Sequence, residues 1–164
     1  MILSEYLKNL KQKLQSNFDL TENYVINEMK YDLFAEYHVR SERYVMIKKA
    51  VAYAIEVNEF CFIKYYEKLD KNKIENFIDS LIKSINLVVK PNNEHMSSMI
   101  TGVIVVDEMP KSEITDIIKK FKYHKGFAFG FKGWVDVRVI LVSLNEGFVI
   151  TNKKGKEVSE VYSI

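Results

Sequence analysis

Cysteine is almost absent from this chain of 164 residues, which contains only Cys61. A single thiol excludes an intramolecular disulfide framework and a zinc site built from several cysteines. Because Cys61 lies between Phe60 and Phe62, we expect a buried, reduced thiol. No apolar run approaches the roughly 20 residues that span a bilayer, and no basic segment precedes an apolar one at the N-terminus. These absences predict a cytoplasmic protein without a membrane partner.

A strong excess of one charge is also missing. The 24 Lys and Arg residues and the 22 Asp and Glu residues leave a formal net charge of +2, too small to indicate a nucleic-acid or membrane partner by itself. The balance along the chain is uneven, because residues 111–164 carry 10 basic and 6 acidic residues, whereas residues 1–110 carry 14 and 16. All six glycines also lie after residue 101. The excess of positive charge and the glycines both lie in the C-terminal part of the chain, where we therefore look for a binding site.

The remaining composition is that of an ordinary globular protein. Hydrophobic residues make up 48% of the chain and charged residues 28%, which argues against disorder. A chain of this length is expected to fold as one compact domain over residues 1–164.

Three segments have the apolar spacing of amphipathic helices. Apolar residues three and four apart predict a helix over residues 2–16. A second helix is predicted to begin after Asp70, whose side chain can cap it. Its buried face is expected to consist of Ile74, Phe77, Ile78, Leu81, Ile82 and Ile85. Pro110 and Ser112 introduce a short third helix.

Alternating apolar and polar residues predict strands elsewhere. After a polar connection at residues 17–23, we expect an antiparallel meander of three strands, with a turn at residues 40–43 and a reversal at Asn58–Glu59. The meander strands are residues 31–39, 44–57 and 59–66. The second of these is also permissive for helix at residues 48–52. The later strands are residues 99–106, 125–132, 134–144 and 147–152, with a last one near 157–162. The order α-βββ-α-β-α-βββ(β) predicts an α+β fold with a mostly antiparallel sheet and three helices.

One segment, residues 125–132 with the sequence Lys-Gly-Phe-Ala-Phe-Gly-Phe-Lys, resembles the RNA-contacting octamer of the RNA recognition motif family. In such an octamer alternate aromatic side chains stack on bases. The first five positions match, whereas the sixth and the eighth depart from the pattern, and the order of the surrounding elements differs from that family's. We therefore interpret the likeness as coincidental and expect a strand whose Phe127, Phe129 and Phe131 pack into the core.

Lysines and aromatic residues alternate around this octamer, and residues 119–132 contain no acidic residue. The cluster consists of Lys119, Lys120, Phe121, Lys122, Tyr123, His124, Lys125 and Lys132. Such a segment can contact phosphate or an acidic partner. Lysines are also favourable at the C-terminus of a helix, which explains part of the cluster without a function.

A charged pair interrupts the apolar segment 134–141. Asp136 and Arg138 are two residues apart, so that they share one face of the predicted strand. Burying either charge alone is costly, and each must therefore be exposed, paired or turned into a cavity. We expect mutual or cross-strand pairing, with a role in a pocket as the alternative.

Asp32, Glu36 and His38 share the polar face of the predicted strand 31–39. Carboxylates with an imidazole suit a divalent metal ion or acid–base chemistry. Alternating polar residues are equally typical of any strand with one solvated face. We therefore assign no metal ligand, no catalytic residue and no cofactor.

Two further stretches are similar in sequence to a family of proteins. Residues 133–138 (Gly-Trp-Val-Asp-Val-Arg) and residues 151–157 (Thr-Asn-Lys-Lys-Gly-Lys-Glu) resemble segments of a small family of uncharacterised proteins from low-GC anaerobes. The resemblance implies no activity.

These observations predict a module that binds a small molecule or a protein partner without catalysis. The prediction rests on the missing catalytic constellations and on the 13% of aromatic residues, which can fill a core, line a pocket or form an interface. The predicted binding residues are Trp134, Asp136, Arg138, Lys120, Lys122, Lys125, Phe127 and Phe129. Self-association through an aromatic sheet face is a further expectation.

Two other functions remain as alternatives. The first is a nucleic-acid-binding protein that uses residues 119–132. The second is a metal-dependent hydrolase that uses Asp32, Glu36 and His38.

Overall fold

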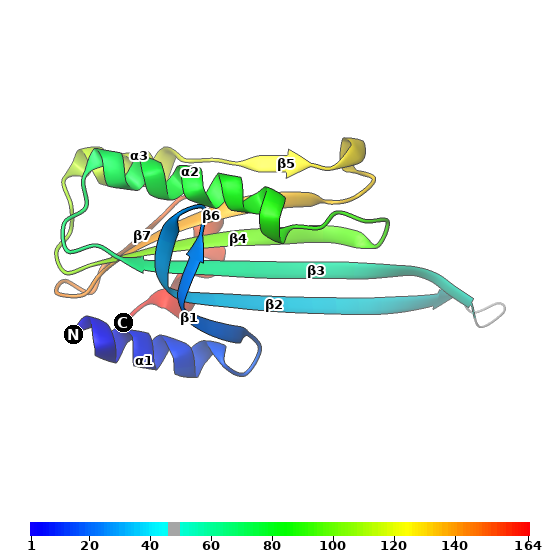
Figure 1. Ribbon diagram of the computed structural model, residues 1–164, viewed down its shortest axis with the longest axis horizontal. Coiled ribbons are helices and arrows are strands. Elements are labelled where there is room, and N and C mark those ends of the chain that lie inside the picture. The colour runs from blue at the N-terminus through cyan, green and yellow to red at the C-terminus, as the bar shows by residue number, and fades with distance from the viewer. Residues whose placement is uncertain (46–49) are drawn as a thin grey trace.

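A seven-stranded mixed sheet forms the centre of the computed structural model (Figure 1). The structure describes the backbone of residues 1–45 and 50–164 and the side chains of residues 1–40 and 56–164. The strands are β1 (Asp19–Ile26), β2 (Met29–Val45), β3 (Ala50–Tyr65), β4 (His95–Val106), β5 (His124–Gly126), β6 (Trp134–Ser143) and β7 (Val149–Thr151). The helices are α1 (Leu3–Leu14), α2 (Lys71–Val88), α3 (Ser112–Lys120) and the one-turn α4 (Ser159–Tyr162), with the 3-10 turns η1 (Ala128–Gly130) and η2 (Lys154–Glu157).

The strand order in space is β1-β2-β3-β4-β6-β5, and β7 also pairs with β6. β1, β2 and β3 form an antiparallel meander. The chain then crosses over twice, through α2 and α3, so that β3, β4 and β6 run parallel. β5 and β7 both pair antiparallel with β6 on its other side. The predicted class, α+β with a mostly antiparallel sheet, and the order α-βββ-α-β-α-βββ are confirmed.

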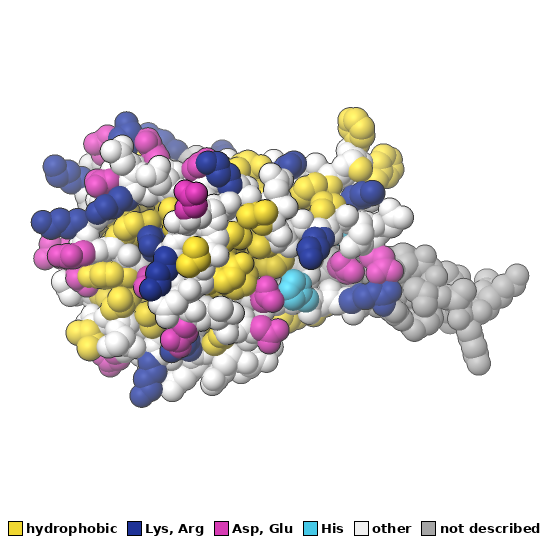
Figure 2. Space-filling view, viewed as in Figure 1, with side chains coloured by type: hydrophobic (Ala, Val, Ile, Leu, Met, Phe, Trp, Pro, Cys, Tyr) yellow, Lys and Arg dark blue, Asp and Glu magenta, His cyan; other side chains and the backbone are white. Residues whose placement is uncertain are grey.

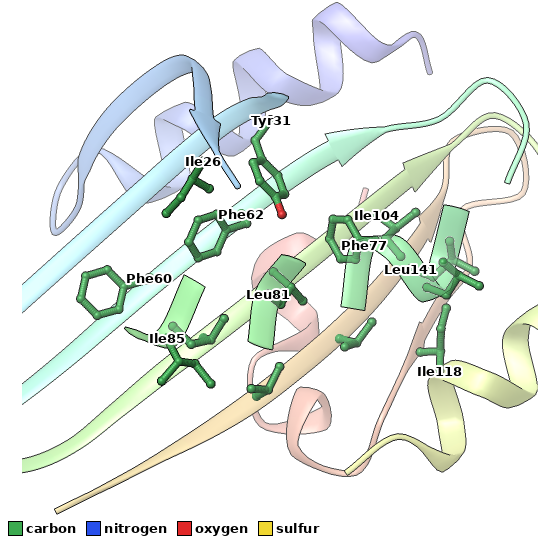
Figure 3. Packing of buried hydrophobic residues seen from close by; sticks show 14 of the residues in the cluster. Ile26, Tyr31, Phe60, Phe62, Phe77, Leu81, Ile85, Ile104, Ile118 and Leu141 are labelled. Atoms are coloured by element: carbon green, nitrogen blue, oxygen red, sulfur yellow. The ribbon is translucent and has the colours of Figure 1, made fainter. Parts of the chain in front are cut away.

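The helices cover the two faces of the sheet and bury a separate apolar cluster on each. In Figure 3, Phe77, Leu81 and Ile85 of α2 and Ile118 of α3 lie over the strands. On the opposite face α1 and α4 pack against β3, β4 and β6. α2 begins where the sequence predicts, because the Asp70 side chain accepts a hydrogen bond of 2.8 Å from the backbone N–H of Lys73. No helix among the described residues is long and apolar enough to cross a bilayer.

The boundaries predicted within the meander are wrong. β1 occupies part of the segment 17–23 that was expected to be a connection, because an edge strand can leave most of its side chains in water. β2 continues through residues 40–43, where Arg40 pairs with Glu56. Asn58–Glu59 is no reversal but lies inside β3, paired with Tyr37 and His38. Polar side chains interrupt the apolar–polar alternation of the sequence, but the backbone hydrogen bonds between two strands can continue past them.

Other local predictions fall partly outside the described residues. The predicted strand 44–57 includes residues 46–49, which lie outside them, as do two of the five residues 48–52 that were considered permissive for helix. Residues 50–52 of that segment belong to β3. The last strand expected near 157–162 is instead η2 followed by α4. The buried thiol expected at Cys61 is confirmed.

Close approach of α2 to the sheet depends on Gly102 in β4. A Cβ atom at this position would lie 2.3 Å from Leu81 Cδ1 and 2.7 Å from Phe77 Cε1. We expect Gly102→Ala to lower the free energy of unfolding by about 1–3 kcal/mol, because the core must shift to admit the methyl group. Urea denaturation measures this change.

Gly126→Ala is the matched control, because its Cβ would meet only ordinary contacts, the nearest at 3.6 Å. Equal stability of the two variants would show that α2 does not pack this closely on β4.

Candidate anion-binding site

β6 has two short partners on one side, and Asn152 fills the space between them. β5 pairs with the start of β6 and β7 with its later part. The Asn152 Oδ1 atom accepts hydrogen bonds from the backbone N–H groups of Val139 (3.1 Å) and Gly155 (2.9 Å). Its Nδ2 atom donates to the carbonyls of Val137 (3.1 Å) and Phe121 (3.3 Å). The side-chain amide therefore replaces a missing piece of strand along buried backbone.

Arg138 is buried on the face of β6 that looks toward α1 and α4, with 7% of its side chain exposed. Its Nη1 atom donates to Glu59 Oε1 at 3.0 Å, and its Nη2 atom donates to Glu157 Oε2 at 3.0 Å. The bond from Arg138 holds the pKa of Glu157 below its usual range. Among the described buried side-chain polar atoms, Arg138 Nε has no hydrogen-bond partner. The carboxylates of Glu59 and Glu157 thus both bind the guanidinium group of Arg138.

Asp136 lies on the same face of β6 as Arg138 but pairs with groups of β5 and η2 instead. Its Oδ1 atom accepts a hydrogen bond of 2.7 Å from His124 Nδ1, across the β5–β6 ladder. Lys154 Nζ lies 3.6 Å from the other carboxylate oxygen and 3.4 Å from Glu157 Oε1. The Asp136 side chain is only 8% exposed, and its charge is met by the hydrogen bond from His124 and by the ammonium group of Lys154.

These groups border a surface pocket of about 230 Å³. Phe121 and Tyr123 contribute to its apolar wall, and Lys122, His124, Lys153 and Lys154 bring nitrogen donors to it. His124 is 62% exposed, and its Nε2 atom has no hydrogen-bond partner among the described residues. The carboxylate in the pocket, Asp136, is already engaged. The arrangement therefore offers several cations and no free anion, which suits an anionic ligand.

The predicted binding residues include exposed lysines close to the pocket and residues of β6 that are partly or fully buried. Lys120, Lys122 and Lys125 are exposed along the end of α3 and β5, close to the pocket in the chain. Trp134 begins β6, half-buried, and pairs in register with Gly126. Arg138 is instead occupied by its two glutamates.

The expectation that the octamer forms a strand with its phenylalanines in the core is wrong for Phe129 and Phe131, whereas Phe127 packs against the core. β5 ends at Gly126, and the chain turns through η1. Phe127 is half-buried, whereas Phe129 is fully exposed and the exposed fraction of Phe131 is 86%. β5 can pair with β6 only as far as Gly126, because β6 begins opposite it at Trp134. The residues between these two positions therefore form the connecting turn and not a strand.

The three polar residues proposed for a metal site do not gather. Glu36 and His38 are neighbours, with 3.9 Å between Glu36 Oε1 and His38 Nε2, but Asp32 accepts a hydrogen bond from the backbone N–H of Tyr65. His38 Nδ1 is engaged with Asn58 Oδ1 at 2.7 Å. Among the residues whose side chains are described, no three His, Cys, Asp or Glu are placed to hold a metal ion.

Several residues of the site escaped the sequence analysis. Glu59 reaches the site from β3, far from β6 in the chain, and the C-terminal segment after β7 supplies Asn152, Lys153 and Glu157. A signal was nevertheless present, because the two stretches that resemble a known family, 133–138 and 151–157, lie against each other here.

Substitution of Asn152 tests whether its side-chain amide replaces the missing piece of strand beside β6. Asn152→Asp keeps the acceptor for Val139 and Gly155 but sets a carboxylate oxygen against two carbonyls. We expect both Asn152→Asp and Asn152→Ala to lower the free energy of unfolding by at least about 2 kcal/mol, because buried backbone groups lose their partners. Asn145→Ala, at an exposed turn, is the control; a wild-type stability of the Asp variant would contradict the role.

Glu157 provides a test of the charge network through pH. Its pKa is lowered in the folded protein, so its carboxylate stabilises the fold above the unfolded pKa of about 4.3, and this contribution is lost as the pH falls through the lower folded value. We expect Glu157→Gln to be less stable than the wild type at pH 7. The two proteins should be equally stable at a pH low enough to protonate Glu157 in both the folded and the unfolded wild type. Unfolding by urea at a series of pH values measures the convergence.

The control for this experiment is Glu160→Gln, at an exposed carboxylate that has no ion pair among the described residues. A constant difference between Glu157→Gln and the wild type at all pH values would show that the ionised carboxylate is not what stabilises the network.

Comparison with known proteins adds a family to this geometry. A family model described as a domain of unknown function, DUF8052, matches residues 3–164. No curated protein and no solved structure gives a significant match to the chain. The likeness to an uncharacterised family inferred from residues 133–138 and 151–157 is confirmed. The chain belongs to the DUF8052 family.

Proposed function

We propose that this protein is a binding module that holds an anionic ligand or partner at a basic edge of its sheet. The basic edge consists of Lys119, Lys120, Lys122, His124, Lys125, Lys132, Lys153 and Lys154. The supporting observation is the pocket at its centre, where three lysines and a histidine surround one carboxylate that is already paired. Such a surface attracts an anion over a distance and then contacts it directly.

The pocket differs from the sites of covalent hydrolases that use a serine, threonine or cysteine. In such a site a buried carboxylate orients a histidine, which activates a nucleophile within hydrogen-bond reach. No serine, threonine or cysteine belongs to the described residues around the pocket. The thiol of Cys61 lies against Tyr162 instead, and burial raises its pKa so that it remains protonated. A reduced thiol of this kind fits the cytoplasm.

The position of β5 supports the same function. β5 is an edge strand in the described sheet, and its three residues are exposed. Lys125 on this strand and Lys120 at the end of α3 carry the positive charge beyond the pocket in both directions along the chain. A partner larger than the pocket can therefore remain in contact with the basic edge.

Charge reversal tests the proposal. Lys122 and Lys153 are exposed and have no ion pair among the described residues, so Lys122→Glu/Lys153→Glu leaves the Asp136 and Arg138 networks intact. We expect the wild type to bind a fluorescein-labelled heparin oligosaccharide at low salt, with affinity that falls as salt rises, and the double variant to bind at least about tenfold more weakly. Fluorescence anisotropy measures both.

The control variant, Lys8→Glu/Lys68→Glu, changes the net charge equally at exposed lysines of α1 and of the segment before α2. Equal loss of binding in both variants would assign the affinity to net charge and not to the basic edge. Absence of binding by the wild type at low salt would refute the proposal.

A further inference from the structure

Two phenylalanines extend into solvent beside the basic edge. Phe129 is fully exposed and Phe131 is 86% exposed, although burying such a ring normally stabilises a protein by about 1.5–3 kcal/mol. In Figure 2 hydrophobic side chains project from the corner of the molecule where Figure 1 places the turn after β5. The fold gains no packing from these rings, which indicates a role outside it.

The turn that carries them is held in one conformation by its backbone. The carbonyl of Phe127 accepts hydrogen bonds from the N–H groups of Gly130 (2.9 Å) and Lys132 (3.1 Å), and its own N–H donates to the carbonyl of Gly133 at 2.9 Å. Ala128 and Phe129 have φ values of 47° and 55°, in the left-handed region that residues with a side chain rarely adopt. This strained geometry persists only because its surroundings determine it.

His95 and Gly133 fix the base of the turn. His95 is buried, and its Nδ1 atom donates to the carbonyl of Lys132 at 2.6 Å while its Nε2 atom accepts from Ser98 Oγ at 2.8 Å. Its ring meets that of Phe127 edge-on, with 5.8 Å between centroids. Gly133 has a φ of 79°, and a Cβ there would lie 2.5 Å from the carbonyl oxygen of Met96. Phe129 and Phe131 therefore stand on a preorganised support.

Positive charge lies on the same support and continues from it. Lys125 Nζ lies 5.5 Å from the centre of the Phe127 ring, and Lys132 belongs to the turn itself. From Phe127 back to Lys122 the chain covers at most ~17 Å at the rise of a strand, and the pocket lies at that end. Along the chain, the basic pocket thus comes before Lys125 and the exposed flat rings come after it.

We propose that the anionic partner is a single-stranded nucleic acid, whose bases stack on Phe129 and Phe131 and whose phosphates follow the basic edge to the pocket. The inference rests on the proposed function. Proteins that bind single strands combine a positive groove with aromatic rings on which bases stack, independently of sequence. A duplex does not offer unstacked bases to such rings.

An anionic membrane also combines apolar and negative groups, but the arrangement of charges fits it less well. Interfacial insertion needs a broad apolar surface within one plane of cations. The other residues of η1 are Ala128 and Gly130, and the lysines that precede the two rings, Lys122 and Lys125, lie before and within β5. This geometry matches an extended chain of alternating bases and phosphates.

The test compares Phe129→Ala/Phe131→Ala with Phe148→Ala, which removes an exposed ring in the β6–β7 turn. Anisotropy with a labelled oligo(dT) of roughly 15 nucleotides is the measurement, and the labelled heparin oligosaccharide is the second probe. We expect the double variant to bind oligo(dT) at least about tenfold more weakly, to bind heparin like the wild type, and Phe148→Ala to bind both normally. Circular dichroism checks that each variant is folded.

Four outcomes would overturn the inference. The first is oligo(dT) binding that does not change in Phe129→Ala/Phe131→Ala. The second is binding of heparin by the wild type without binding of oligo(dT), which would leave the proposed function standing. The third is binding to phosphatidylserine vesicles that depends on the two rings while oligo(dT) is not bound, which would assign the surface to a membrane. The fourth is absence of binding to both heparin and oligo(dT), which would refute the proposed function as well.

Discussion

The requirement to neutralise two charges buried on β6 determines how the C-terminal third of this protein is arranged. Arg138 and Asp136 lie on the same face of a strand that is buried along almost its whole length. A buried charge without a partner costs several kcal/mol, so each must be met by groups from elsewhere in the chain. Glu59 comes from β3, His124 from β5, and Glu157 and Lys154 from η2. These pairs hold η2 and β5 against β6.

The same pairing explains why the basic edge is positive although the whole chain is close to neutral. Asp136 lines the pocket and Glu157 lies beside Lys154, and both carboxylates are already engaged by side chains of the network. Lys122 and Lys153 have no such partners among the described residues and remain as uncompensated charge. A modest excess of lysine in residues 111–164 thus becomes a local positive surface, because Asp136 and Glu157, two of the six acidic residues of that region, are paired within the network.

The fold class, the element order and the cap of α2 could be predicted because they depend on local periodicity and local hydrogen bonds. The ends of β2 and β3 could not, since pairing in a long hairpin continues past polar residues such as Asn58 and Glu59. The surroundings of Asp136 and Arg138 required contacts between residues up to 79 positions apart in the chain. Exposure of Phe129 and Phe131 was missed because an alternating pattern does not reveal that the strand ends at Gly126.

By itself the sequence determined the class of the fold, the amphipathic helices and the segment that concentrates lysine and aromatic residues, because each is a property of neighbouring residues. Only the tertiary structure decided which charges cancel and which remain, and which aromatic rings are buried. Those outcomes depend on distances between segments that meet through the sheet, where β5, β7 and Asn152 share one side of β6. The cluster in residues 119–132 was visible in the chain, but its rings and cations acquired a common surface only when the turn was anchored by His95 and Gly133.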